Sequence, residues 1–291
     1  MERPTDYTER MSSSTIAQAA RTGFSYLLRR WRSGRRMSQL DLALEAAVSA
    51  RHISFLESGR AQPSREMVLK LANALQVPFR EQNILLQAAG FASVFRETSL
   101  DAAEMANVRR ALELILRAHE PFRALAMTRY WDAVMVNRPQ AALLTHLLNR
   151  PIPPLTILSP PRPNVLRLLF EAAELRSLLV NWETVARVVL HRVHREALWA
   201  RDEGLAALAH ELGTCLPSPS SVSDVPAEVS SVVIPMEVRS GSEVLRFFST
   251  ITTLGAPQDI TLQELRVEAF FPADDRTEQR VLEDYAALQD R

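Results

Sequence analysis

The spacing of apolar and polar residues between Ser38 and Gly59 predicts two short helices joined by a tight bend. Ser38 stands where the first helix needs an N-cap, and Asp41 three residues later completes a capping pattern. The apolar positions of this first helix recur at helical spacing and are expected to be buried; they are Leu40, Ala43, Leu44 and Ala47.

The bend and the second helix follow the same logic. Val48 lies beneath the bend, and Ser49 caps the second helix, whose Ile53 and Leu56 point inward. Gly59 ends this helix, because glycine tolerates the left-handed conformation that follows a helix. Two helices this short cannot bury a core alone. The pair is typical of a helix-turn-helix, whose second helix enters the major groove of DNA.

Three further helices complete a domain over residues 21–90, after a polar arm over 1–20. A helix before the pair carries one apolar face, made of Phe24, Leu27, Leu28 and Trp31. A helix after Pro63 and Ser64 has a buried stripe, made of Val68, Leu71, Ala72 and Leu75. A fifth helix, over 79–89, stops at Gly90. The pattern predicts an all-α domain of five helices around one core.

After a connector over 91–103, the period changes within residues 104–291. The helices expected there cover residues 104–118, 139–149, 164–170, 181–200, 202–213 and 274–289. The expected strands cover 123–128, 133–137, 232–239, 243–254 and 262–271. A Ser/Pro-rich loop fills 214–231, and Ser240-Gly241 supplies a hairpin turn. A small antiparallel sheet flanked by helices is an α+β arrangement.

Charge is distributed unevenly between these two parts. The whole chain is balanced, with 34 Lys/Arg and 34 Asp/Glu. Residues 21–90 hold 11 basic and 5 acidic residues, a balance of +6, whereas residues 91–291 hold 21 and 26, a balance of −5. A basic first domain followed by an acidic second part indicates that the first domain binds a polyanion, here double-stranded DNA.

Other features of the composition limit the class of protein. The single Cys215 cannot form an internal disulfide and suits a reducing compartment. No apolar run approaches the ~20 residues of a membrane-spanning helix, and the N-terminus lacks the apolar core of a signal peptide. The sequence therefore predicts a cytoplasmic protein with no membrane partner.

The first domain resembles the Cro/phage-repressor (XRE) helix-turn-helix family, whose fold is the lambda-repressor-like bundle. The matching residues are Ser38-Gln39, Val48-Ser49, Ile53-Ser54, Leu56-Glu57-x-Gly59 and Pro63-Ser64. The resemblance implies base contact by the second helix of the pair, through Ser49, Ala50, Arg51, His52, Ser54 and Phe55. For Phe55, packing on a thymine methyl and packing in the core stay equally open. Arg51 is the leading candidate, because a guanidinium bonds bidentately to guanine.

The same resemblance implies contacts to the DNA backbone, which position a protein without reading sequence. The resemblance places Gln39, Arg60 and Arg65 at phosphate-contacting positions. Arg35 and Arg36 are also expected to contact phosphate, because the arginine-rich face of the first helix leads directly into Gln39; a solvated charged face is the alternative for them. Arg32 and Glu57 match a pair that is often an internal salt bridge in this family, so a structural role is expected for them.

The second domain resembles the PAS-like, MmyB-type ligand-binding domain that follows this helix-turn-helix in bacterial regulators. The matching pieces are His119-Glu120-Pro121, Trp131-Asp132 with Asn137, Asn164-Val165-x-Arg167-Leu168, Phe247 to Thr250 and Phe270 to Asp274. The resemblance implies a small apolar ligand, such as a fatty acid. The bulky residues expected to line its site are Phe122, Trp131, Met135, Leu143, Phe170, Trp182 and Phe247.

Enzyme chemistry finds little support in the sequence. His191, His194 and Glu196 fall near one face of a helix, as metal ligands would. Arg192 and Arg195 interleave with them, and their positive charge opposes a divalent cation, so a solvated helix face is the favoured interpretation. No nucleophile motif or glycine-rich phosphate loop is present. We therefore expect no catalytic residue, no metal and no cofactor.

Three interpretations follow for the whole chain. The first is a transcription regulator that binds an inverted-repeat operator as a homodimer and senses a small apolar ligand. The alternative is a DNA-binding scaffold whose C-terminal domain only dimerises or binds protein partners. An enzyme that a helix-turn-helix targets to DNA has the least support, because the sequence contains no convergent acid, base, nucleophile or metal set.

Overall fold

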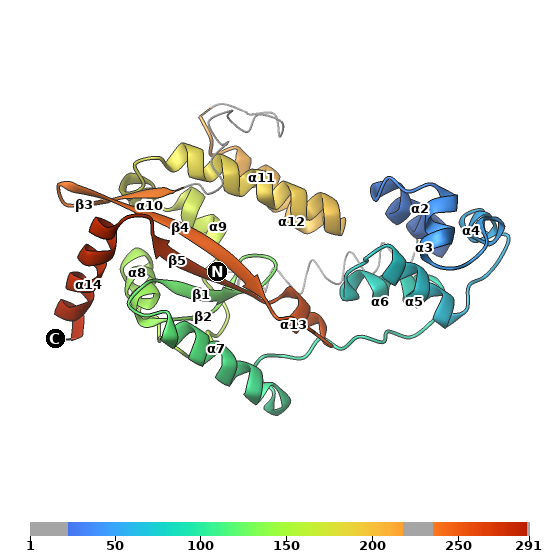
Figure 1. Ribbon diagram of the computed structural model, residues 1–291, viewed down its shortest axis with the longest axis horizontal. Helices are drawn as coiled ribbons and strands as arrows, with labels where there is room; N and C mark the ends of the chain where they lie inside the picture. The colour runs from blue at the N-terminus through green and yellow to red at the C-terminus, as the bar shows by residue number, and fades with distance from the viewer. Residues whose placement is uncertain (1–22, 218–234, 290–291) are drawn as a thin grey trace, which may run out of the picture. The chain divides into compact units, whose positions relative to one another are not determined.

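The computed structural model describes residues 23–217 and 235–289, and the chain forms two compact units (Figure 1). The described part of the first unit comprises residues 23–97 and, from much later in the sequence, Ala256–Gln263. The second unit comprises the described residues of Thr98–Gly255 and Glu264–Arg291. The arm expected over 1–20 lies outside the described residues.

Among the described residues, five consecutive helices build the first unit, as the sequence predicts. They are α2 (Phe24–Gly34), α3 (Gln39–Glu45), α4 (Ala50–Glu57), α5 (Arg65–Ala74) and α6 (Phe79–Ala88). Their apolar faces meet in one core, where the residues with 0% exposed area include Leu28, Leu42, Ile53, Leu56 and Leu71. Each such side chain contributes about 1.5–3 kcal/mol when it leaves water. The helices are therefore held by shared burial, since each is too short to be stable alone.

Side-chain caps begin three of these helices where the sequence places them. The Ser38 hydroxyl accepts the Asp41 N–H at 3.1 Å, and the Asp41 carboxylate accepts the Ser38 N–H at 2.7 Å, which completes a capping box. Ser49 caps α4 and Ser64 caps α5, each through the N–H three residues on. Gly59 follows α4 with a φ of 73°, a conformation that a Cβ would strain.

The buried face of α3 differs from the predicted one. Leu40 and Leu44, expected to be buried, expose 58% and 72% of their area. Ala47, also expected to be buried, is exposed, and only Ala43 of the four predicted positions is buried, together with Leu42 and Ala46. The prediction was wrong in phase, because a seven-residue helix with apolar residues on both sides supports two alternative stripes.

The second unit is built on a five-stranded antiparallel sheet with the order β2-β1-β5-β4-β3 (Figure 1). The strands are β1 (Ala124–Met127), β2 (Ala133–Val136), β3 (Met236–Ser240), β4 (Glu243–Thr253) and β5 (Arg266–Pro272). This sheet confirms the α+β prediction and the two predicted hairpins. Residues 232–234 of the third predicted strand lie outside the described residues.

Helices cover both faces of this sheet (Figure 1). One face packs on α7 (Ala106–Ala118), which follows the short turn η1 (Ala103–Met105). The other face shares a larger core with α8 (Arg138–Leu148), α9 (Val165–Glu171), α11 (Trp182–Ala200) and α12 (Glu203–Gly213). The unit also contains α10 (Ala173–Leu178), which was not predicted, and the predicted C-terminal helix α14 (Asp275–Gln289). None of the described helices is both long and apolar enough to cross a membrane.

The connection between β4 and β5 belongs in large part to the first unit. It contains α13 (Ile260–Glu264), so the strand predicted over 262–271 begins later, at Arg266. The Gln263 side-chain oxygen accepts the Phe79 N–H at 2.7 Å, at the start of α6, which has no side-chain cap from its own N-cap residue. The Ile260 N–H donates to the carbonyl of Arg96 at 2.8 Å. This segment therefore completes the helical unit from a distant part of the sequence.

Candidate DNA-binding helix and ligand-binding core

The α4 helix is anchored to the core of the first unit by one face. Ile53 and Leu56 have 0% exposed area. The residues expected to read bases lie around the rest of the helix. Ser49 and Arg51 are exposed, whereas Ala50, His52, Ser54 and Phe55 are half-buried. With α3 and the bend, α4 forms the helix-turn-helix that the sequence predicts, and its outward face presents one long cationic side chain, Arg51.

Phe55 supports Arg51 from beneath. The Arg51 guanidinium carbon lies 5.2 Å from the centroid of the Phe55 ring, within the range of a cation–π interaction. Phe55 is half-buried and does not belong to the apolar core of the unit. The structure therefore does not support the predicted role of Phe55 in the core; packing on a thymine methyl stays a prediction.

Glu57 fixes the end of α4 to α2 and α3. The Arg32 Nε and Nη2 atoms donate to its two carboxylate oxygens at 2.6 and 2.8 Å, and the Gln39 side chain donates at 2.8 Å. The Glu57 side chain is only 3% exposed. Burial raises the pKa of this carboxyl, but the bonds from Arg32 and Gln39 outweigh it and hold the pKa below its usual value. The internal pair expected for Arg32 and Glu57 is confirmed.

The residues expected to contact phosphate fall into two groups. Arg35 donates to the Leu75 carbonyl at 2.9 Å and lies over the Trp31 ring at 5.0 Å, so it joins α2 to the end of α5. Gln39 is bonded inside the unit, as described above. The exposed group consists of Arg36, Arg60 and Arg65. This second group fits phosphate contact better than Arg35 and Gln39, whose donors have internal acceptors.

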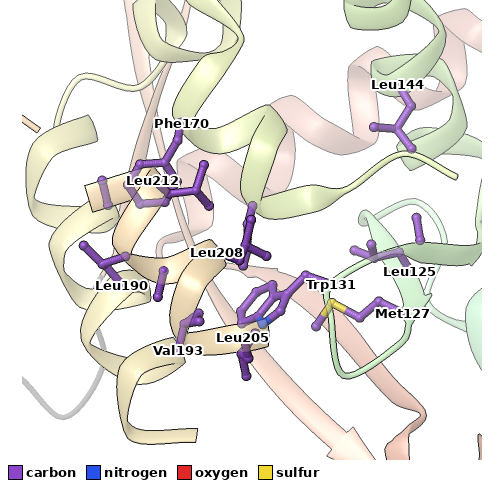
Figure 2. Close-up of a cluster of buried hydrophobic side chains, with 14 of the residues drawn as sticks. Leu125, Met127, Trp131, Leu144, Phe170, Leu190, Val193, Leu205, Leu208 and Leu212 are labelled. Carbon is purple, nitrogen blue, oxygen red and sulfur yellow. The ribbon is translucent and has the colours of Figure 1, made fainter. Parts of the chain in front are cut away.

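Three of the expected ligand contacts share the main core of the second unit. They are Trp131, Phe170 and Trp182. The rings of Phe170 and Trp182 meet edge-on with centroids 6.2 Å apart. Figure 2 shows the Trp131 indole between Met127 on one side and Leu205 on the other. The indole N–H of Trp131 is buried, and no acceptor reaches it among the described residues.

Met135 lies on the opposite face of the sheet from Trp131, which corrects the expectation of a shared site. Its cluster contains Leu112 and Leu116 of α7. The cause is a β-bulge, because Ala126 pairs with Met135 while the next residue of β1 pairs with Ala133. One extra residue in β2 turns Met135 to the α7 side.

The other expected ligand contacts are also dispersed. Phe122 is half-buried beside His119, with ring centroids 5.9 Å apart. Leu143 is half-buried on α8 and belongs to none of the described core clusters. Phe247 is 4% exposed, on the same side of the sheet as the main core, and lies under the guanidinium of Arg123. Aromatic and bulky composition alone therefore could not predict on which face of the sheet each of these side chains lies.

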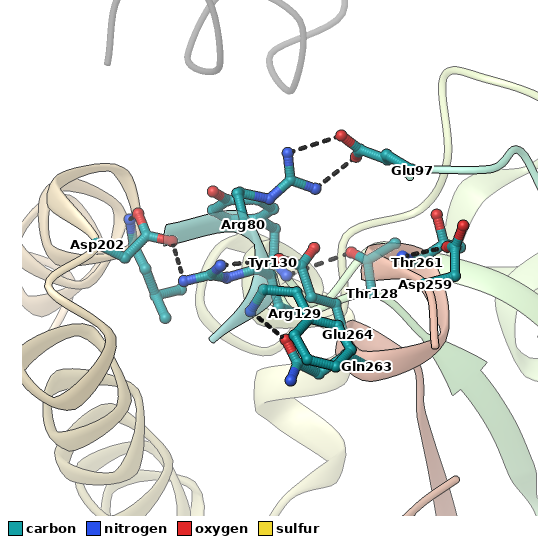
Figure 3. A network of polar contacts seen from close by, with 12 residues as sticks. Arg80, Glu97, Thr128, Arg129, Tyr130, Asp202, Asp259, Thr261, Gln263 and Glu264 are labelled. Atoms are coloured by element: carbon teal, nitrogen blue, oxygen red, sulfur yellow. Dashed lines mark hydrogen bonds and ion pairs between the residues drawn. The ribbon is translucent and has the colours of Figure 1, made fainter. Parts of the chain in front are cut away.

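Arg129 organises the polar contacts of the second unit, and sequence reasoning missed it. It lies in the turn between β1 and β2, is 4% exposed, and pairs with Asp202 at 2.7 Å and Glu264 at 2.9 Å (Figure 3). Asp202 also caps α12. Glu264 is 135 residues away in sequence, so no local pattern could have found the pair. The sequence showed only that Arg129 begins the short run Arg129-Tyr130-Trp131-Asp132 between two apolar strands.

The residues that carry the second resemblance hold the fold together. The Asn164 side-chain amide donates to Asp132 and to the Tyr130 carbonyl, each at 2.8 Å, and its oxygen caps α9. The His119 ring lies 2.8 Å from the carbonyl oxygen of Phe270. These contacts tie the β1–β2 turn to α9, and α7 to β5. Their roles are structural, since all of the acceptors are groups of the chain itself.

The candidate metal ligands on α11 are engaged with other groups. Glu196 pairs with Arg266 at 2.6 Å and with Arg192 at 3.3 Å. The His194 ring lies 3.0 Å from the Leu190 carbonyl. No group of three His, Cys, Asp or Glu residues suited to a metal occurs in the described ranges 23–217 and 235–289.

The helix-turn-helix with its outward Arg51 defines the first unit as a DNA-binding domain, and an α+β domain follows it in the chain. The comparisons agree with this class. A family model described as helix-turn-helix matches residues 28–82. The model of the MmyB-like transcription regulator ligand binding domain matches residues 108–282, more than half of the chain. The chain therefore belongs to the family of MmyB-like transcription regulators. No match was found among curated proteins.

Proposed function

We propose that the chain reads a specific operator as a homodimer and that its second unit senses a small apolar ligand. The observation that carries the DNA part is the geometry of Arg51. Its side chain is exposed on α4, is backed by the ring of Phe55, and projects from a helix that Glu57 fixes in place. A guanidinium presented in this way can donate bidentately to O6 and N7 of guanine.

A homodimer is proposed because one helix-turn-helix reads few base pairs. Two copies related by a two-fold axis read an inverted repeat, and this symmetry adds the selectivity that one copy lacks. Most apolar area of the five helices is used in their own core. Leu40 and Leu44 of α3 and Tyr26 of α2 remain exposed, so the first unit also offers apolar surface for contact between copies.

The sensing part is supported by the indole N–H of Trp131. This donor is buried within the main core and meets no acceptor among the described residues. Buried donors without acceptors are uncommon, and each one calls for an explanation. An acceptor atom on a bound ligand would give the Trp131 N–H its hydrogen bond. The alternative, a scaffold whose second unit only dimerises, gives no reason for such a donor.

The DNA part is tested by selecting an operator from random duplexes with the full-length protein. Arg51→Ala should then cost about 1–3 kcal/mol on that operator and less on a scrambled duplex. The matched control is Arg60→Ala, which removes the same charge from an exposed position. It should weaken both duplexes alike and reduce the slope of affinity against salt by about one. Equal losses on both duplexes for Arg51→Ala would remove it from base readout.

The sensing part is tested by native mass spectrometry of protein purified from its own host. A retained small molecule should be found, and its removal should change operator affinity. A change requires that the ligand bind two arrangements of the dimer with different affinity, because tight binding alone shifts nothing. A ligand-free protein whose operator affinity is unaffected by added apolar molecules would support the scaffold instead.

A further inference from the structure

The short helix α13 is shared between the two units. Its residues 260–263 belong to the first unit, and Glu264 belongs to the second. Ile260 is buried, and its N–H donates to the carbonyl of Arg96 at 2.8 Å. Leu265, directly after the helix, is buried in the cluster that packs on α7. Both ends of α13 are therefore held in place by buried residues.

Two neighbouring residues of this helix make their contacts in different units. The Gln263 side-chain oxygen accepts the Phe79 N–H at 2.7 Å, at the first residue of α6. The Glu264 carboxylate accepts from Arg129 at 2.9 Å, in the turn between β1 and β2 (Figure 3). Gln263 and Glu264 are joined by one planar peptide bond within a helical turn, which leaves few soft torsions between them. A displacement of Glu264 therefore moves the acceptor that Gln263 gives to α6.

The contact between Arg129 and Glu264 tolerates little displacement. The Glu264 side chain is only 13% exposed, so water cannot readily replace the guanidinium. Arg129 also meets Asp202 at 2.7 Å. Bonds between ionised partners are stronger than neutral ones, and a buried charge that loses its partner is strongly unfavourable. Glu264 is therefore expected to follow Arg129 when the β1–β2 turn moves.

The turn that carries Arg129 also carries Trp131. Trp131 has a φ of 67°, a left-handed conformation that strains a bulky residue. Its N–H donates to the Thr128 carbonyl at 3.0 Å, and the Thr128 N–H donates to the Asp132 carbonyl at 3.0 Å. The buried indole N–H of Trp131 meets no acceptor among the described residues. A ligand that supplied this acceptor would act on the same strained turn that holds Arg129.

The start of α6 is a point at which such a displacement can alter the DNA-binding unit. Pro78, the N-cap residue of α6, provides no side-chain cap, and Gln263 supplies an acceptor for the Phe79 N–H instead. The helix contributes Leu85 and Leu86 to the core of the five helices. It packs on α2, which in turn packs on α4, the candidate DNA-reading helix.

We propose that α13 couples the two units. In this proposal the pair of Glu264 with Arg129 transmits the state of the β1–β2 turn to the cap that Gln263 provides for α6. The inference rests on the proposed function, in which a ligand of the second unit changes operator binding. It requires that the ligand favour one of two arrangements of the turn, since equal affinity for both would shift nothing. Without the pair, a change in the turn would leave the α6 cap unaltered.

The first test measures hydrogen exchange of the Phe79 amide by NMR in the full-length protein. Gln263→Ala should speed this exchange about 2- to 30-fold, as loss of a helix cap does. Glu264→Gln should speed it at least twofold in the wild-type background. In the Gln263→Ala background, Glu264→Gln should have almost no further effect, because Glu264 acts on α6 through Gln263. Additive effects of the two substitutions would overturn the coupling.

The matched control for this test is Glu196→Gln. It is the same substitution in another partly buried ion pair of the second unit, with Arg266 at 2.6 Å, and it leaves α13 unchanged. It should not alter exchange of the Phe79 amide. An effect as large as that of Glu264→Gln would show that general loosening of the second unit explains the result, against the proposal.

Arg129→Met perturbs the same contact from the turn, with the sequence of α13 unchanged. It should speed exchange of the Phe79 amide at least as much as Glu264→Gln does. The substitution strands the charges of Asp202 and Glu264, so the triple variant Arg129→Met/Asp202→Asn/Glu264→Gln replaces it if the single variant does not fold. Wild-type exchange of Phe79 in whichever of the two variants folds would overturn the coupling.

Operator affinity provides the functional readout, with dodecanoate as an apolar probe. Dodecanoate should change the operator affinity of the wild type at least threefold. This response should be lost in Glu264→Gln and kept in Glu196→Gln, while all three proteins still bind the probe. An equal response in Glu264→Gln and the wild type would overturn the coupling and leave sensing intact. If the wild type does not respond to dodecanoate, the sensing of such acids fails, and the exchange cycle of Gln263 and Glu264 decides the coupling.

Discussion

Removal of Arg32 should destabilise the DNA-binding unit far more than a surface substitution would. In Arg32→Met, the Glu57 carboxylate keeps its place at the end of α4 but loses two of its three charge-assisted bonds. The Glu57 side chain is 3% exposed and that of Arg32 12%, so water cannot replace the lost donors without opening the helix contact. Breaking a buried pair by removing one partner costs about 3–5 kcal/mol. Because the Gln39 bond survives, the expected loss is near the lower end, about 3 kcal/mol.

The effect should depend on pH in a defined direction. The pKa of Glu57 in the folded protein is below its usual value, so the pair contributes stability above the unfolded pKa of about 4.3. This contribution is lost as the pH falls through the folded pKa, where the carboxyl takes up a proton. The difference between wild type and Arg32→Met should therefore be largest near neutral pH and shrink in acid.

Hydrogen exchange followed by mass spectrometry measures the effect in the full-length protein. Amides of α2 and α4 should lose about 3 kcal/mol of opening free energy, while those of the second unit provide an internal reference. Arg110→Met is the control, because Arg110 pairs with Glu113 at an exposed position and should cost under about 1 kcal/mol. The double variant Arg32→Met/Glu57→Leu should recover part of the loss. A double variant as unstable as the single one, or equal losses in Arg32→Met and Arg110→Met, would refute the reasoning.

Three further outcomes are expected. The free energy of unfolding of the second unit should fall as the pH rises from the ordinary glutamate pKa through the raised pKa of Glu268, because the folded state holds a proton that the unfolded state has released. Urea unfolding measures this pH dependence, and Glu268→Gln should remove it. Gln263→Ala should cost about 0.5–2 kcal/mol of protection at the start of α6, and unchanged exchange at Phe79 would contradict the cap. Footprints on the operator should show half-site centres ~34–36 Å apart or a multiple of this, and equal affinity for one isolated half-site would count against the dimer.

Local chemistry explains what the sequence predicted well. The first turn of α3, α4 and α5 each begins with a serine whose hydroxyl accepts an N–H three residues on, so the boundaries were readable from neighbouring residues. The same holds for Asn164 at the start of α9 and for the hairpin around Gly241. Arg51 was readable too, because the spacing of Ile53 and Leu56 fixes which side of α4 faces outward.

Features set by distant contacts escaped prediction. The phase of α3 depends on which of two stripes the other helices cover, and short helices do not encode that choice. The bulge that turns Met135 away from Trp131 is a register shift between strands, which alternation within one strand cannot reveal.

The path of the chain through α13 limits how this protein can be taken apart. The chain leaves the helical unit after Glu97, returns to it for Ala256–Gln263, and re-enters the second unit at Glu264, the partner of Arg129. A single cleavage between the units therefore cannot release an intact DNA-binding half. A fragment ending near residue 97 would lack the acceptor that Gln263 gives to Phe79. Any rotation of one half against the other must be accommodated at three points of the backbone instead of one flexible tether.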